Sequence, residues 1–357
     1  MRRKRVVRFV GFVVVIIAVF VCAKAFKGKI KPRTDSVPLN SMTQQVTTNV
    51  TSAAESVGDL ISSEISEVDA ASDESSVSSI PTNEDTPCDD VYVDYIDVGQ
   101  GDATLIYDET SDYSVLIDTG LWEAYDNVQA TFAEYGIMEV DALVLTHPDT
   151  DHIQSAVDVI KDYNVPVVYM SRAQNNEAKA YEYLMGYLEE QYSGDIRYPV
   201  PGEELLLGQG CKLAFLGPVR VNNPDDTNGN SLVMKLENGL DSFLFVGDAT
   251  GDEIDDVISS GQDVSADVYK ASHHGSANDG CNSYDFIRQV DPKYMVISCG
   301  YLNEHGHPHK ETMAIASQMN LKLYRTDLQG SICCLSRGNG LVWQQEPSTV
   351  YTNGNGF

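Results

Sequence analysis

The chain has 357 residues, of which 42% are apolar, so it can form one large domain with appendages or two modest domains around a sizeable core. This composition excludes disorder of the whole chain. The formal net charge of −29 repels phosphate backbones, which disfavours a general nucleic-acid-binding protein unless metal ions or a local patch reverse the field.

The charge is distributed unevenly along the chain. Residues 1–33 carry ten Lys and Arg residues and no acidic residue, whereas residues 34–160 contain no Lys or Arg. Residues 91–357 hold 41 acidic residues against 14 basic ones. The basic N-terminus is therefore a segment distinct from the acidic remainder.

An apolar run of 15 residues, Phe9–Ala23, follows this basic segment. It is shorter than the roughly 20 residues of a membrane-spanning helix, and it suits the apolar region of a signal peptide with a cleavage site at residues 23–25. The alternative is an uncleaved signal anchor. Residues 1–26 are therefore assigned to a signal anchor or signal peptide. Both interpretations place the rest outside the cytoplasmic membrane, either as a single-pass membrane protein or as a secreted one.

Residues 27–90 are predicted to be a disordered linker. From Thr34 to Asp90 the chain is rich in Ser, Thr and acidic residues, has no aromatic residue, and shows no sustained apolar period. Its like charges favour an extended spacer.

Ordered structure is expected from Val91 onward, beginning with alternating apolar residues. Up to residue 192 we predict strands at 91–98, 103–107, 114–118, 142–146 and 167–170, and helices at 124–135, 153–163 and 177–192. A glycine at position 136 is expected to end the first helix.

The second half of the chain mixes the two kinds of element. We predict strands at 212–216, 232–237, 242–246, 268–271, 294–298, 322–324 and 331–336, and helices at 252–260, 281–290 and 309–319. Strands that dominate early and then alternate with helices indicate an α/β fold of two sheets faced by helices. The domain is assigned to residues 91–345, and residues 346–357 to a flexible tail.

The cysteines outside the apolar run have no metal-knuckle spacing. In an exported domain they could form disulfides, and buried free thiols are the alternative. Adjacent cysteines at 333 and 334 point to opposite faces of a predicted strand, so they are not expected to pair with each other.

Four potential metal ligands lie within six residues, directly after the apolar strand at 142–146. They are His147, Asp149, Asp151 and His152. A strand end can direct several donors to one point, and a set of imidazoles and carboxylates suits Zn²⁺ or Mn²⁺. The alternative is a solvated acidic loop with two surface histidines.

Further candidates follow other predicted strands. Asp248 comes after a strand and a glycine, and His273 and His274 follow the strand at 268–271. His307 belongs to a third cluster with His305 and His309. All seven histidines of the chain lie in these three clusters, which is difficult to explain by structure alone.

The motifs resemble those of the metallo-β-lactamase superfamily, and within it the ComEC-type branch named for a DNA-uptake competence protein. The resemblance spans residues 91–342. It rests on matching order and spacing of Asp97–Ala103, Leu116–Gly120, Leu145–His152, Asn230–Val233, Leu244–Asp248, Lys270, His273–Ser276 and Gly306–Pro308.

The resemblance implies an αββα sandwich with the site along one sheet edge. In the superfamily pattern His-x-His-x-Asp-His, Asp149 replaces the second histidine, as is usual in this branch. By carry-over, His147 and Asp149 serve a first divalent metal ion, Asp151, His152 and His274 serve a second, and Asp248 bridges. Zn²⁺ is the expected ion and Mn²⁺ the alternative, because one histidine of the superfamily has no counterpart and Asn230 lies nearby instead. A mononuclear site also stays open.

Other residues are expected to support the chemistry. Asp151 would orient a metal-bridging hydroxide, while His273 and Lys270 would stabilise developing negative charge. Gln100, Asp102, Asn230 and His307 are expected to lie behind or beside the ligands. Each has a purely structural alternative, such as a turn residue or the end of a strand.

The expected function is metal-dependent hydrolysis of a phosphodiester outside the cell. The substrate would be a single-stranded nucleic acid or a cell-wall or lipid phosphodiester, and no dedicated protein partner is evident. The alternatives are a lactamase- or lactone-type hydrolase and a non-catalytic, metal-stabilised surface binding module.

Overall fold

The computed structural model describes residues 88–356. The predicted signal segment and nearly all of the predicted linker lie outside the described residues, so those assignments stay predictions. Among the residues that are described, no helix has the length and apolar character to cross a membrane.

The first sheet has eight strands in the order β15-β14-β1-β2-β3-β4-β5-β6. Its N-terminal strands are antiparallel, and from β3 to β6 they are parallel. The strands are β1 (Val91–Tyr95), β2 (Thr104–Asp108), β3 (Tyr113–Ile117), β4 (Ala142–Leu145), β5 (Val167–Met170), β6 (Asp195–Arg197), β14 (Ile332–Ser336) and β15 (Leu341–Trp343).

The second sheet has seven strands in the order β13-β12-β11-β10-β9-β8-β7. The run from β10 to β13 is parallel, and the remaining pairs are antiparallel. The strands are β7 (Glu204–Gly208), β8 (Cys211–Gly217), β9 (Val233–Asn238), β10 (Asp241–Phe245), β11 (Val268–Lys270), β12 (Tyr294–Ile297) and β13 (Lys322–Arg325).

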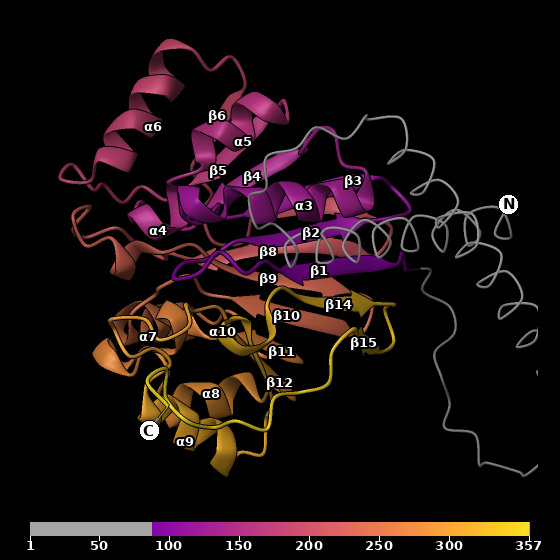
Figure 1. Ribbon diagram of the computed structural model, residues 1–357. Helices are drawn as coiled ribbons and strands as arrows, with labels where there is room; N and C mark the ends of the chain where they lie inside the picture. Colours follow the sequence, from indigo (N-terminus) through magenta and orange to yellow (C-terminus); the bar gives the residue numbers. More distant parts are fainter. Residues whose placement is uncertain (1–87, 357) are drawn as a thin grey trace, which may run out of the picture. The chain divides into compact units, whose positions relative to one another are not determined.

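Helices cover the outer face of each sheet (Figure 1). Those on the first sheet are α3 (Tyr125–Tyr135), α4 (Thr150–Ile153), α5 (Ala156–Asp162) and α6 (Lys179–Glu190). Those on the second are α7 (Gly251–Ser259), α8 (Tyr284–Val290) and α9 (Lys310–Gln318), and a short α10 (Thr326–Gln329) follows β13. One apolar core lies between the sheets and one lies under each helical layer. The predicted two-sheet sandwich faced by helices is confirmed.

Most predicted elements are present with shifted ends, and the differences have local causes. The predicted helix at 153–163 is two helices, α4 and α5, separated by Gln154 and Ser155. The strands β6, β7 and β15 were not predicted, because they are short and largely exposed or half-buried edge segments without a clear alternation. Gly136 ends α3 in the left-handed conformation with φ of 74°, as predicted.

The parallel strands deliver the candidate ligands. Parallel neighbours end at the same edge of a sheet, so loops after β4, β10, β11 and β12 gather where the two sheets meet. His147 follows β4, Asp248 follows β10, and the pair His273–His274 follows β11.

The six cysteines in the described part of the chain are all free thiols. Cys88 is half-buried and the other five are buried. On β14, Cys334 faces the core between the sheets, whereas Cys333 contacts the Tyr135 hydroxyl at 3.6 Å. The prediction that these two point to opposite faces is confirmed.

The segment assigned to a tail is bonded to the domain. Tyr351 donates its hydroxyl hydrogen to the Leu321 carbonyl at 2.7 Å, and the Gly354 amide donates to the Pro308 carbonyl at 3.0 Å. Figure 1 shows the C-terminus beside α8 and α9.

Candidate metal centre

The predicted ligands converge from three loops on the carboxylate of Asp248. Its Oδ1 lies 3.3 Å from Nε2 of His152, and its Oδ2 lies 3.6 Å from Nε2 of His274. Nε2 of His274 is also 3.2 Å from Oδ2 of Asp151. Asp151, His152, His274 and Asp248, the residues predicted for the second site, thus lie together as one group of donors.

A second group of donors approaches Oδ2 of the same carboxylate. Nε2 of His147 is 3.6 Å from Oδ2 of Asp149 and 3.9 Å from Oδ2 of Asp248. Nε2 of His273 is 3.7 Å from Oδ2 of Asp248. The structure therefore brings together all six predicted ligands, and the carboxylate of Asp248 lies near members of both groups.

Several of these donor atoms are buried without a hydrogen-bond partner. They are Nε2 of His147, His152 and His274, and Oδ1 of Asp248. A buried polar atom without a partner costs about 1–3 kcal/mol, so four of them around one carboxylate need a compensating interaction. Divalent cations would provide it, and imidazole nitrogen with carboxylate oxygen suits Zn²⁺ or Mn²⁺. The residues fit such a centre.

The charges of the groups agree with this assignment. Burial would raise the pKa of Asp248, but the adjacent imidazoles of His152 and His274 lower it well below its usual range. Burial would likewise lower the pKa of His152, yet the carboxylates of Asp248 and Asp118 raise it well above 6.5. The carboxylates thus favour positive charge at the ring nitrogens, and a divalent cation would supply the same charge.

Asp118 fixes the orientation of the histidines that follow β4. Its Oδ2 accepts a hydrogen bond from Nδ1 of His152 at 2.8 Å and from the Thr146 hydroxyl at 2.7 Å. The Thr146 oxygen in turn lies 3.1 Å from Nδ1 of His147. With Nδ1 occupied, each ring presents Nε2 to the centre. Asp118 thus braces the loop that carries His147 and His152.

His274 is oriented in the same way by the backbone. Its Nδ1 lies 3.0 Å from the Ser298 carbonyl, so Nε2 is directed at Asp248. His273 and His274 both have left-handed backbone conformations, with φ of 47° and 55°. Such conformations cost of order 1–3 kcal/mol each for residues other than glycine and concentrate at functional sites.

Asp102 lies closer to the centre than expected. One carboxylate oxygen of Asp102 and donor atoms of His152, Asp248 and His274 all lie within 4.8 Å of one another, and all four residues are buried. The Asp102 carboxylate is also paired with the ammonium of Lys270, at 2.8 Å and 2.9 Å. We favour Asp151 as the ligand, because this lysine already neutralises Asp102.

Lys270 does not have the place that the sequence analysis gave it. Its side chain is 5% exposed, and its ammonium contacts Asp102 and the carbonyl of Ala271. The ammonium is neutralised by Asp102 in this buried ion pair and does not line the open cavity. The predicted role of Lys270 in stabilising developing charge on a substrate is therefore wrong.

Asn230 makes its hydrogen bonds within its own loop and to Ser171. Its amide donates to the carbonyls of Asn223 and Asp226, and its carbonyl accepts from the Ser171 hydroxyl. It holds the loop before β9 together. The next residue, Ser231, accepts a hydrogen bond from the Asp248 amide at 3.2 Å. Asn230 is thus one residue from a contact to Asp248, and its place beside the ligands stays a prediction.

An open cavity of about 360 Å³ lies over the centre. It contains predicted ligands together with residues from loops that the sequence analysis placed nearby. The lining residues are Gln100, Leu121, Asp149, Thr150, Asp151, Asp248, His273, His274, Glu304, His305 and His307. Gln100 and His307 thus lie beside the ligands, as expected. Oε1 of Gln100 accepts from the Gly300 amide at 3.2 Å.

Sequence reasoning missed some residues that contact the ligands. The Asn175 amide donates to Oδ1 of Asp149 at 2.8 Å, and nothing in the sequence around Asn175 indicates this contact. Glu304 lines the cavity, and its neighbouring histidines were the available signal.

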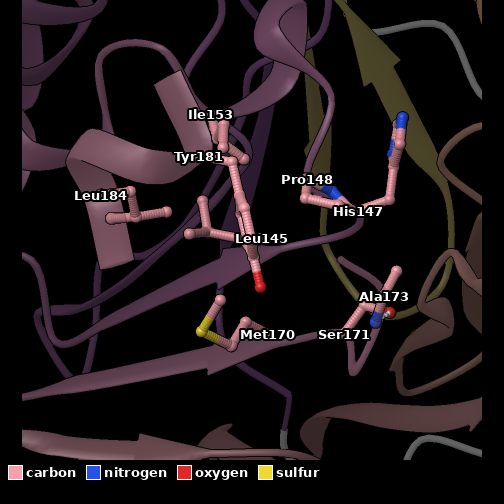
Figure 2. Close-up of a pocket in the computed structure, with 9 residues that line it drawn as sticks. All are labelled: Leu145, His147, Pro148, Ile153, Met170, Ser171, Ala173, Tyr181 and Leu184. Atoms are coloured by element: carbon pink, nitrogen blue, oxygen red, sulfur yellow. Dashed lines mark hydrogen bonds between the residues drawn. The ribbon is translucent and has the colours of Figure 1, made fainter. Parts of the chain in front are cut away.

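A small apolar pocket lies behind the loop that carries His147. Tyr181 and Leu184 of α6 pack against Leu145 and Ile153 there. Figure 2 shows the His147 imidazole pointing away from these apolar side chains. The apolar side chains around the pocket thus pack behind the loop, while Nε2 of His147 faces the candidate metal centre.

The family description "Metallo-beta-lactamase superfamily" matches residues 96–299, which include the loops after β4, β10 and β11. The chain belongs to the metallo-beta-lactamase superfamily. The family match supports the assignment of an αββα fold. The histidines and carboxylates that converge in it are therefore the candidate metal centre of a metallo-hydrolase fold.

Two curated relatives are ComEC-type competence proteins. ComE operon protein 3 of Bacillus subtilis is 30% identical over 256 residues, covering 67% of this chain and 32% of the relative. Competence protein ComA of Neisseria gonorrhoeae is 29% identical over 276 residues, covering 74% of this chain and 36% of the relative. The chain thus spans about a third of the length of these relatives.

Among solved structures, the metallo-beta-lactamase fold protein YhfI from Bacillus subtilis aligns with a TM-score of 0.48 and 15% identity. The alignment covers 70% of this chain and 100% of that protein.

Proposed function

We propose that this protein is an extracytoplasmic hydrolase that uses two divalent metal ions, preferably Zn²⁺ with Mn²⁺ as the alternative, to cleave phosphodiesters. The observation that carries the proposal is the group of buried donor atoms without hydrogen-bond partners at the Asp248 carboxylate. When bound there, two divalent cations acidify water and polarise a phosphoryl oxygen.

The side chains around the centre have distinct tasks in this proposal. His147, Asp149, Asp151, His152, His274 and Asp248 hold the ions. Burial alone would raise the pKa of the Asp151 carboxyl, but the neighbouring His274 and His152 lower it by more, so the pKa lies below its usual range. Asp151 therefore stays ionised and can accept a hydrogen bond from the attacking water.

His273 is the candidate for binding the reacting phosphoryl group. It lines the cavity, its side chain is 25% exposed, and burial lowers its pKa below 6.5. A neutral imidazole at this position can donate a hydrogen bond to an oxygen that gains negative charge.

Two exposed aromatic residues that are close in sequence to residues of the cavity lining favour a single-stranded nucleic acid over the alternative cell-wall or lipid phosphodiester. Trp122 is 54% exposed and follows Leu121 of the cavity lining, and Tyr301 is 70% exposed and precedes the loop with Glu304 and His305. Exposed aromatic rings bind bases by stacking, which tolerates any sequence. The competence relatives support the same substrate class, and the acidity of the chain disfavours tight binding of a duplex.

The extracytoplasmic location is part of the proposal. It rests on the basic segment and the apolar run at Phe9–Ala23, which would attach the domain to the membrane or direct its secretion.

The proposal is tested with the full-length protein loaded with Zn²⁺ or Mn²⁺. We expect hydrolysis of bis-p-nitrophenyl phosphate and of labelled single-stranded DNA, and no hydrolysis of nitrocefin. Asp151→Asn should abolish turnover, whereas Asp126→Asn, an exposed position on α3, should not change it. Turnover of nitrocefin alone would favour the lactamase alternative, and bound metal without any turnover would favour a non-catalytic module.

A further inference from the structure

The C-terminal segment Ser348–Gly354, named here the strap, contacts the loop that carries His307 at the cavity. The Gly354 amide donates to the carbonyls of Pro308 at 3.0 Å and Gly306 at 3.3 Å. The fit is close, since a Cβ atom on Gly354 would overlap the His307 carbonyl oxygen. The strap therefore touches the backbone on both sides of His307.

A buried arginine anchors the strap. The Arg325 side chain is 1% exposed, and its guanidinium binds both oxygens of Asp327 at 3.0 Å and 2.7 Å. Its remaining arm donates to the carbonyls of Thr352 at 2.6 Å and Val350 at 3.3 Å. A buried guanidinium is costly unless its N–H donors are hydrogen-bonded. Asp327 binds Nε and Nη2 of Arg325, and the strap carbonyls accept from Nη1, which Asp327 does not reach.

Two further contacts hold the strap along β13. Leu323 forms an antiparallel bridge with Ser348, and the Tyr351 hydroxyl donates to the Leu321 carbonyl. The strap is thus fixed at three places before it reaches the His307 loop.

On its other side, the loop packs on the turn that carries two candidate metal-centre residues. The His309 amide donates to the Gly275 carbonyl at 3.0 Å, directly after His273 and His274. The rings of His307 and His273 lie 5.4 Å apart. His307 is 4% exposed and lines the cavity, and its Nδ1 has no hydrogen-bond partner. Unlike Nδ1 of His152 and His274, Nδ1 of His307 accepts or donates no hydrogen bond, so the ring depends on its backbone and on packing against neighbouring imidazoles.

We propose that the strap, through Gly354 and the anchor Arg325, positions His307 over the metal centre for substrate binding or turnover. Gly354 and Arg325 are positioning residues, because neither lines the cavity. The inference rests on the proposed hydrolase function, since His307 affects turnover only if the cavity is an active site.

The test compares Gly354→Ala with Gly186→Ala in the full-length, metal-loaded protein. Gly186 is exposed on α6, a Cβ atom added there would meet no other atom within 4 Å, and its φ is not positive, so its substitution disturbs neither the backbone nor the loop. We expect Gly354→Ala to lower turnover of bis-p-nitrophenyl phosphate about 10- to 100-fold, as displacement of a site residue does, with the metal content unchanged. A chain that ends after Pro347 should show the same loss.

A double-mutant cycle with His307→Ala separates positioning from a general loss of stability. If the strap acts through His307, Gly354→Ala changes turnover less than about 2-fold in the His307→Ala background. Fully additive effects of the two substitutions would overturn the proposal.

Hydrogen exchange of the backbone amides at 303–309 gives a readout that does not depend on turnover. Faster exchange in Gly354→Ala and in the shortened chain supports the strap, and unchanged exchange in both overturns it. If the wild-type protein hydrolyses none of the substrates, the proposed function fails, and the exchange rates still decide whether the strap holds the loop.

Discussion

Two histidine-rich loops meet at the centre, and they are held in place by different means. In the loop after β4, the rings of His147 and His152 are fixed by side-chain contacts to Thr146 and Asp118. In the loop after β12, Asn303 binds the backbone of His307 while Nδ1 of that ring has no partner. Rings that must present one nitrogen to a metal need a partner on the other nitrogen. The first loop is therefore built to hold ions and the second to line the cavity above them.

The largest effect is expected from Asp248, which both donor groups share. Asp248→Asn removes the charge between the groups, so turnover should fall more than about 100-fold, beyond the loss typical of a residue that only supports a ligand. Metal analysis should then find fewer than two ions per chain. A variant that keeps two ions and the wild-type rate would contradict the shared role of this carboxylate.

A smaller effect is expected from the residues that support each loop. Asp118→Ala leaves His152 without its Nδ1 acceptor, so metal affinity should fall about 10- to 100-fold. Asn303→Ala, which weakens the second loop, should leave metal affinity unchanged. Titration against a chelating indicator measures both. Equal losses of metal affinity in the two variants would show that the loop after β4 is no more important for metal binding than the loop after β12.

The smallest effect is expected on the free energy of unfolding of the metal-free protein, to which His152 and His307 contribute with opposite pH dependence. Carboxylates raise the pKa of His152 against the effect of burial, whereas burial and the neighbouring histidines lower the pKa of His307 to about 3. His152 therefore contributes stability below pH 6.5 that is lost as pH rises through its raised folded-state pKa. His307 has the opposite effect on the free energy of unfolding. Below pH 6.5 its imidazole binds a proton in the unfolded chain but stays neutral in the folded protein, so stability falls as the pH falls.

Nitrogen NMR of the imidazoles checks this prediction. At pH 5 we expect His152 to be an imidazolium and His307 to be neutral. Titration of both rings near pH 6.5 would show that the two loops do not differ in this way.

The sequence was sufficient to predict the fold and to predict that the candidate ligands in contiguous motifs lie close together. His147, Asp149, Asp151 and His152 follow one apolar strand, and the topology of parallel strands explains why Asp248 and His274 arrive at the same edge. Such ligands are predictable, because their spacing within the motif and their place at a strand end are both visible in the chain.

Long-range pairing was not predictable from the residues alone. Lys270 is paired with Asp102, which lies 168 positions away, and no local pattern indicates that this pair is buried. Likewise, no property of residues 348–354 shows that Arg325 needs their carbonyls. Burial of a charge depends on which side chain meets it in the folded protein, so its function cannot be assigned from its place in a strand.

The turn at His273 and His274 carries a further consequence for how this protein can change. Both residues have positive φ values, a conformation in which glycine is relaxed and β-branched residues are strained. Glycine at either position would therefore make the chain easier to fold while it removes an imidazole from the centre. Conformational stability and the candidate metal centre therefore favour different residues at these two positions.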